Sequence, residues 1–82
     1  MAQELLAQGQ DDECLTWCER ILARDRCWEQ AYRLMMRLHA RRGDRAQARR
    51  VFERCLQALR QELDVEPSPA TQEVFRQVVS SQ

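Results

Sequence analysis

Residues 43–68 read GDRAQARRVFERCLQALRQELDVEPS, and this stretch decides how the rest of the chain folds. From Ala48 to Leu63 the apolar residues recur every three or four positions, which is the spacing of one face of an α-helix. The remaining positions are mostly Arg, Gln and Glu, which suit a solvated face. The stretch therefore predicts a long helix with a single apolar stripe, and such a helix needs helical neighbours on that side.

The ends of this helix carry their own signals. Gly43 can adopt the left-handed conformation that ends a preceding helix. Asp44 is placed to cap the new helix, and Gln47 follows at the spacing of a capping box. Pro67 and Pro69 forbid continuation. These signals predict a helix of about 19 residues, roughly 28 Å long.

The N-terminal third of the chain predicts two more helices. Residues 1–8 form a short helical end with Leu5 and Leu6 as its apolar contacts, and Gly9 stops it. Asp11 then caps a second helix that runs to about residue 24.

Two further helices complete the prediction. One begins at Asp25 and runs to about residue 42, with Trp28 on its buried side. The other is capped by Ser68, has Pro69 at its first position and extends to about residue 80.

The chain repeats itself with a period of 34 residues, the period of tetratricopeptide units. This shift carries Gly9 onto Gly43, and residues 19–20 (Glu-Arg) onto residues 53–54 (Glu-Arg). We therefore expect an all-α fold: a single domain of antiparallel helix pairs in a tetratricopeptide-like, right-handed stack of about five helices. Within residues 1–82, the expected repeats span about 1–24 and 28–63, with a capping helix at about 69–80.

The apolar stripes predict which residues form the core. The residues expected there are Tyr32, Met35, Leu38, Gly43, Ala48, Phe52, Cys55 and Leu59. The four Cys residues are expected to serve as small apolar residues, because the only His is His39 and no paired zinc-ligand spacing is present. We expect no metal and no cofactor.

Charge is balanced overall but unevenly distributed. The chain has 13 basic residues, all Arg, and 13 acidic residues, giving zero net charge. Residues 1–32 hold three Arg and seven acidic residues, whereas residues 33–54 hold eight Arg and two acidic residues. Zero net charge without interleaved aromatic residues argues against nucleic acid as the main ligand. No apolar run is long enough to span a bilayer, so we expect a soluble, cytoplasmic protein.

The sharpest candidate for binding is a row of Arg residues on the third predicted helix. Arg33, Arg37 and Arg41 are four positions apart and share a stripe with Gln30. This stripe could bind an acidic peptide, a partner subunit or a phosphate. Alternatively, it is a solvated face paired with acidic residues of neighbouring helices. Trp17 is a further candidate, either as an interface anchor or as a residue at the margin of the core.

The sequence resembles a known family over most of its length. Residues 28–38 (WEQAYRLMMRL), 52–63 (FERCLQALRQEL) and 66–71 (EPSPAT) are similar to the bacterial transcriptional activator domain of regulators like the Streptomyces antibiotic regulatory proteins. The chain departs from that family at Asp64, where Gly is usual.

The resemblance implies a regulatory and oligomerising module that follows a winged helix-turn-helix DNA-binding domain. Its partners would be that domain, a second protomer or other proteins, and this chain alone would not read DNA sequence or meet a membrane. Two alternatives stay open: a free-standing tetratricopeptide adaptor that binds peptides, and an appendage of a multidomain signalling enzyme. The sequence contains no nucleophile elbow and no phosphate-binding Gly-rich loop, so we expect no enzymatic activity.

Overall fold

The computed structural model describes residues 2–80, with side chains described for residues 11–80. Within residues 2–80 the protein has four α-helices and no strand: α1 (Ala2–Arg24), α2 (Glu29–Arg41), α3 (Arg45–Glu62) and α4 (Pro69–Ser80). The all-helical prediction is confirmed, but the chain forms four helices where about five were expected. None of the four is long and apolar enough to cross a membrane.

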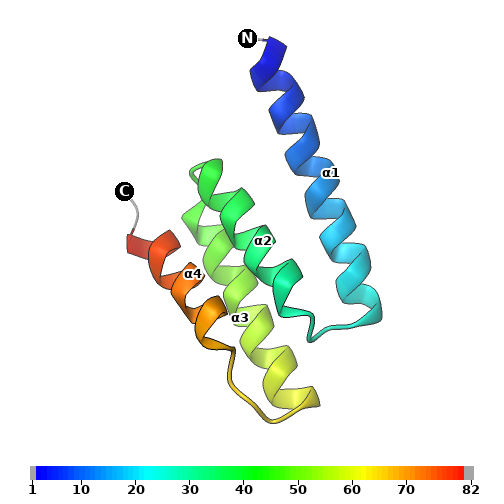
Figure 1. Ribbon diagram of the computed structural model, residues 1–82, viewed down its shortest axis with the longest axis vertical. Helices are drawn as coiled ribbons and strands as arrows, with labels where there is room; N and C mark the ends of the chain where they lie inside the picture. The colour runs from blue at the N-terminus through cyan, green and yellow to red at the C-terminus, as the bar shows by residue number, and fades with distance from the viewer. Residues whose placement is uncertain (1, 81–82) are drawn as a thin grey trace.

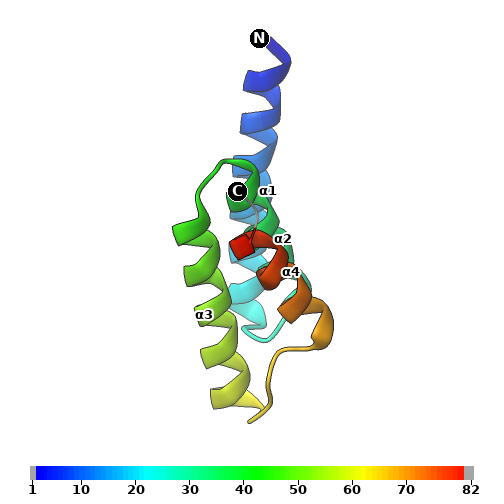
Figure 2. The same ribbon diagram turned by 90° about the vertical axis from the view of Figure 1, so that its left-hand side faces the viewer.

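Helix α2 is the centre of the molecule. In Figure 1, α1 and α4 flank α2 on opposite sides while α3 lies behind it, and Figure 2 shows α3 set apart from the other three. Helix α2 packs against each of the other helices, α3 packs against α2 and α4, and α1 packs against α2 and is joined to α3 by an ion pair between Glu19 and Arg54 at 2.9 Å. Consecutive helices run antiparallel, and the N-terminal part of α1 projects beyond the rest (Figures 1 and 2).

The two predicted N-terminal helices are one. Helix α1 continues through Gly9, because a single Gly inside a helix costs only about 1 kcal/mol relative to Ala. Asp11 is therefore not an N-cap; it is buried, and its Oδ1 lies 3.5 Å from Nη1 of Arg41. The predicted contacts of Leu5 and Leu6 fall outside the described side chains.

Helix α2 begins four residues later than expected. Oδ1 of Asp25 accepts a hydrogen bond from the backbone N–H of Cys27 at 3.0 Å, and this local turn replaces the predicted first turn of helix. Trp28 occupies the N-cap without a side-chain capping bond, and its side chain is 47% exposed. The prediction that Trp28 is buried is wrong.

The predicted start of α3 is confirmed. Gly43 has φ +76°, its N–H donates to the carbonyl of Ala40, and the N–H of Asp44 donates to the carbonyl of His39, which together form a Schellman motif. Oδ1 of Asp44 caps α3 by accepting from the N–H of Gln47 at 3.1 Å. The backbone N–H of Asp44 already donates to the carbonyl of His39. Of the two hydrogen bonds of a capping box, only the one from the N–H of Gln47 to Asp44 is therefore formed.

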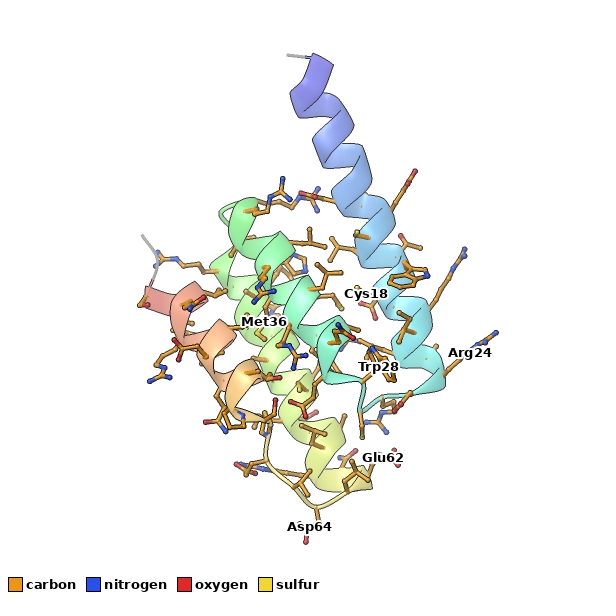
Figure 3. All side chains as sticks on the ribbon, viewed as in Figure 1. Cys18, Arg24, Trp28, Met36, Glu62 and Asp64 are labelled. Atoms are coloured by element: carbon orange, nitrogen blue, oxygen red, sulfur yellow. The ribbon has the colours of Figure 1, made fainter. Side chains whose placement is uncertain are left out.

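A short loop joins α3 to α4. Asp64 has φ +54°, a left-handed conformation that Gly adopts without strain and that Asp tolerates. This loop includes the exposed Leu63 and Val65 and ends at Ser68, whose Oγ lies 3.5 Å from the N–H of Thr71 as the predicted cap of α4. Figure 3 shows Asp64 at the far tip of the loop.

The core lies where α1, α3 and α4 meet α2. Its buried residues include Tyr32, Met35, Leu38, Ala48, Cys55 and Leu59 together with Cys18, Met36, Thr71, Val74 and Val78. Of the residues expected in the core, Gly43 lies outside it and Phe52 packs against its edge. Gly43 is exposed in the α2–α3 turn, and Phe52 is half-buried, with its ring stacked on that of Phe75 at a centroid distance of 4.0 Å.

Candidate functional site

A groove of about 730 Å³ lies between α1 and α2. Its floor is apolar and consists of Cys18 and Ile21 from α1 with Ala31 and Leu34 from α2. In Figure 3, Cys18 lies in the space between these two helices. A concave apolar surface of this kind accepts apolar side chains of a ligand.

Two tryptophans border the groove. Trp17 extends from α1 with 60% of its surface exposed, and Trp28 lies at the start of α2. Exposed tryptophans beside an apolar groove offer large contact area with one hydrogen-bond donor each, which is why Trp is enriched among interface anchors. Figure 3 shows Trp28 beside the ends of α1 and α2 that lie near the loop joining them.

The polar residues of the groove come from α2. Gln30, Arg33 and Arg37 line it, so the structure brings four of the five predicted interaction residues, these three and Trp17, into one site. No acidic residue is among the described residues that line the groove. The groove therefore combines an apolar floor with a cationic side.

The three Arg residues of the predicted row have different surroundings. Nη1 of Arg33 donates to Oγ1 of Thr71 in α4 at 2.9 Å. Arg41 forms an ion pair with Asp11 and lies outside the groove. Arg37 is exposed and has no ion pair or hydrogen bond with any residue whose side chain is described. Of the row, Arg37 is the side chain left available to a ligand.

Arg33 belongs to a polar network between α2 and α4. Oε1 of Glu29 accepts from the hydroxyl of Thr71 at 2.7 Å and from the backbone N–H of Ser68 at 2.8 Å. The Thr71 hydroxyl can therefore donate to Glu29 while it accepts from Arg33. This network fixes both the start of α4 and the Arg33 guanidinium.

The network also changes the acidity of Glu29. Burial acts to raise the pKa of the Glu29 carboxyl, but the hydrogen bonds from Thr71 and Ser68 outweigh burial and hold the pKa below its usual value of 4.5. Glu29 and Thr71 are 42 positions apart, so no local sequence pattern could have paired them.

The Arg-rich turn between α2 and α3 is partly neutralised by α1. Nη1 of Arg41 lies 3.5 Å from Oδ1 of Asp11, and Nη2 of Arg42 lies 3.0 Å from Oδ1 of Asp12. Of the predicted row, Arg41 therefore has the pairing with an acidic residue of a neighbouring helix that was the alternative to a binding role.

The cysteines do not form a reactive or metal-binding group among the described residues. All four are free thiols, and Cys18 and Cys55 are buried. Burial raises the pKa of Cys55 to about 12, so its thiol stays protonated at neutral pH. No cluster of three or more potential metal ligands occurs within the part of the chain that is described.

Sequence reasoning missed Trp28 and the groove floor. The available signal was that Gln30, Leu34 and Arg37 share one stripe of α2 immediately after Trp28. That stripe contains both an apolar and a charged residue. Such a mixture indicates a face at the edge of the core that is partly in contact with solvent.

Comparison with known proteins gives one match. The model of the bacterial transcriptional activator domain family matches residues 1–79. No curated protein and no solved structure matches the chain.

Proposed function

This chain belongs to the bacterial transcriptional activator domain family, and we propose that it is the regulatory and oligomerisation module of such an activator. It acts by protein–protein contact on an attached DNA-binding domain or on a second protomer. The observation that carries this proposal is the α1–α2 groove, which combines two exposed tryptophans with the exposed Arg37.

The finer architecture that we propose is a tetratricopeptide-like stack. Helix α1 stands for the second helix of one repeat, α2 and α3 form a complete antiparallel pair, and α4 closes the stack. The support for this assignment is the 34-residue period and the central position of α2 between α1 and α4 (Figure 1).

The proposed mechanism is a shift between two populations of the activator. A partner that binds the groove favours one arrangement of the attached DNA-binding domain by its difference in affinity for the two states. The site itself holds side chains suited to binding, and we propose no enzymatic step for it.

The test is transcription from a promoter that depends on the activator. We expect Trp17→Ala and Arg37→Glu, made in the activator that carries this chain, each to reduce transcription about tenfold, as loss of roughly 1.4 kcal/mol of binding would do. Arg49→Glu is the matched control, because Arg49 is exposed on α3 and lies outside the groove. Unchanged transcription in both groove variants would contradict the proposal.

Two other functions have distinct outcomes. A free-standing adaptor would bind an acidic peptide in titration, lose it with Arg37→Glu, and have no DNA-binding domain in its gene. A signalling appendage would be encoded beside a cyclase or an ATPase. Sequencing about 100 codons upstream of the segment separates these cases from a winged helix-turn-helix activator.

A further inference from the structure

We propose that α1 is exchanged between two copies of this chain, with residues 25–28, which join α1 to α2, as the hinge. In the resulting dimer the hinge becomes helical, so that residues 2–41 form one continuous helix. Helix α1 of each copy then packs on α2 and pairs with α3 of the other copy, as it does within one copy. This inference rests on the oligomerisation proposed above and specifies how two protomers combine. The groove between α1 and α2 is then built from two chains.

The first argument is that the hinge contains no residue that stops a helix. The other two connections each contain a residue with positive φ: Gly43 with φ +76° between α2 and α3, and Asp64 with φ +54° between α3 and α4. The hinge has no such residue, and residues 10–42 contain neither Gly nor Pro. Trp28, the N-cap of α2, makes no capping hydrogen bond with its side chain. A helix can therefore continue through the hinge without the penalty of Gly or Pro.

The second argument is that the hinge is held as a turn largely by contacts with neighbouring helices. The hydroxyl of Tyr32 donates to the carbonyl of Arg26 at 2.7 Å, and the Arg26 guanidinium donates to two side chains at the end of α3, both at 3.2 Å. Within the hinge, the carboxyl of Asp25 accepts from the N–H of Cys27. Exchange of α1 gives up these contacts, and the backbone groups of the hinge gain helical hydrogen bonds in return.

The third argument is the way in which α1 is joined to the rest of the molecule. It packs on α2, and its carboxylates pair with Arg residues of the other helices: Asp11 with Arg41, Asp12 with Arg42 and Glu19 with Arg54. The last pair is bidentate, with two hydrogen bonds of 2.9 Å, and fixes α1 against α3. None of these pairs involves the hinge, so a second copy provides all of them. Exchange of an identical element preserves its interface and is a low-cost route to a dimer.

The arrangement of the helices allows a symmetric exchange. Helices α1 and α2 run antiparallel (Figure 1), and Figure 3 labels Arg24 at the end of α1 and Trp28 at the start of α2, on the two sides of the hinge. When two hinges straighten, two helices of about 60 Å lie antiparallel, with the α1 half of each on the α2 half of the other. The two-fold axis passes near the hinges, so the assembly closes at two copies.

Substitutions at position 26 test whether the hinge straightens. The N–H of Trp28 donates to the carbonyl of Asp25, which closes a turn with Arg26 at its second position, where Pro is favoured. Arg26→Pro therefore keeps the turn and forbids the continuous helix. Arg26→Ala is the matched control, because it removes the same side-chain contacts and favours helix.

The measurement is analytical ultracentrifugation of the 82-residue chain from micromolar to millimolar concentration, with circular dichroism to establish that each variant is helical. We expect the wild type to dimerise and Arg26→Ala to dimerise more tightly. Arg26→Pro should dimerise at least about a thousandfold more weakly than Arg26→Ala, because each dimer contains two hinges. Equal dimerisation by the two variants, or a wild type that stays monomeric, would overturn the inference.

Charge reversal distinguishes exchange of α1 from any other dimer. Glu19→Arg and Arg54→Glu each place like charges opposite one another within one chain. In an exchanged heterodimer of these two variants, each α1 lies on the other chain, so both pairs regain opposite charges.

Native mass spectrometry of the two variants, mixed, unfolded and refolded together, measures this preference. We expect heterodimers to exceed their statistical share severalfold. A mixture of Glu19→Arg with Arg49→Glu is the control and should pair statistically, because Arg49→Glu changes neither residue of the ion pair. Statistical pairing in both mixtures would overturn the inference, since the copies would then meet through another surface.

The two proposals fail in different ways. Preferred heterodimers, in an activator whose transcription is unaffected by Arg26→Pro, would support the exchange of α1 and contradict the oligomerisation role. Reduced transcription with Trp17→Ala and Arg37→Glu, together with an 82-residue chain that stays monomeric, would support the regulatory role and overturn the exchange.

Discussion

At the scale of single residues, Glu29 links two elements that are distant in sequence. One carboxylate oxygen accepts hydrogen bonds from both Thr71 and Ser68, and Arg33 bonds to the same threonine. Because hydrogen bonds to a charged acceptor are stronger than neutral ones, this residue contributes more to stability when it is ionised. The position of α4 therefore depends on the protonation of one side chain.

Glu29→Gln should make stability less dependent on pH. The folded pKa of Glu29 is lowered, so its contribution is fully present above the unfolded value of 4.5 and is lost as pH falls through the folded value. We expect the variant to be about 1 kcal/mol less stable than wild type at pH 7, since Gln keeps the acceptor oxygen but not the charge. Urea unfolding between pH 7 and pH 3 checks whether the difference closes. A constant difference would contradict the assignment.

Two glycines provide a second prediction at this scale. Gly43→Ala should destabilise the protein by about 1 kcal/mol, because φ +76° strains any residue with a Cβ and no neighbouring atom lies within 4 Å to add a clash. Gly9→Ala should instead stabilise it by about 0.5–1 kcal/mol, because Gly9 lies inside α1. Thermal unfolding of both variants measures the opposite signs. Destabilisation by Gly9→Ala would indicate a turn at residue 9.

At the scale of elements, α4 is attached to the molecule on two sides. The hydrogen bonds of Glu29 join its first turn to α2, while Phe75 stacks on Phe52 of α3 with an interplanar angle of 12°. Val74 and Val78 of the same helix are buried. A short helix of 12 residues is held in this way by tertiary contacts rather than by its own helix propensity.

The Phe52–Phe75 stack should show measurable coupling. Phe52→Ala is expected to cost about 2 kcal/mol, less than the roughly 3–5 kcal/mol of a fully buried Phe, because the ring is half-buried. A double-mutant cycle with Phe75→Ala should give a coupling free energy of about 1 kcal/mol. Additive losses would show that the two rings do not interact in solution.

At the scale of the whole molecule, the fold depends on α2. Since α1 packs mainly against α2 and is joined to α3 by the Glu19–Arg54 ion pair, a change that loosens α2 removes most of the packing of α1. Met36, labelled in Figure 3, lies near the middle of α2 and is completely buried, and Met35 beside it is 2% exposed. Both residues belong to the core cluster that α2 shares with α1, α3 and α4.

Met36→Ala should therefore destabilise the molecule as one unit. The expected loss is about 3 kcal/mol, a large share of the roughly 4–12 kcal/mol of a domain this size. Circular dichroism and tryptophan fluorescence should report the same midpoint, because Trp17 and Trp28 lie beside α2. Separate midpoints would show that α1 unfolds independently.

The sequence by itself determined the local features. The caps at Asp44 and Ser68, the turn at Gly43 and the apolar stripe of α3 depend on residues at most a few positions apart, so their pattern is visible in one dimension. The family resemblance also follows from residues in order along the chain, and the match over residues 1–79 confirms it.

Only the tertiary structure decided how surfaces are covered. Whether Trp28 is buried, whether Arg37 is paired and whether Glu29 finds Thr71 all depend on helices that arrive from far along the chain. Helix periodicity predicts which residues share a face, but burial of that face requires a neighbour, and sequence spacing does not specify one. The groove between α1 and α2 exists for this reason, since none of the four helices described covers it.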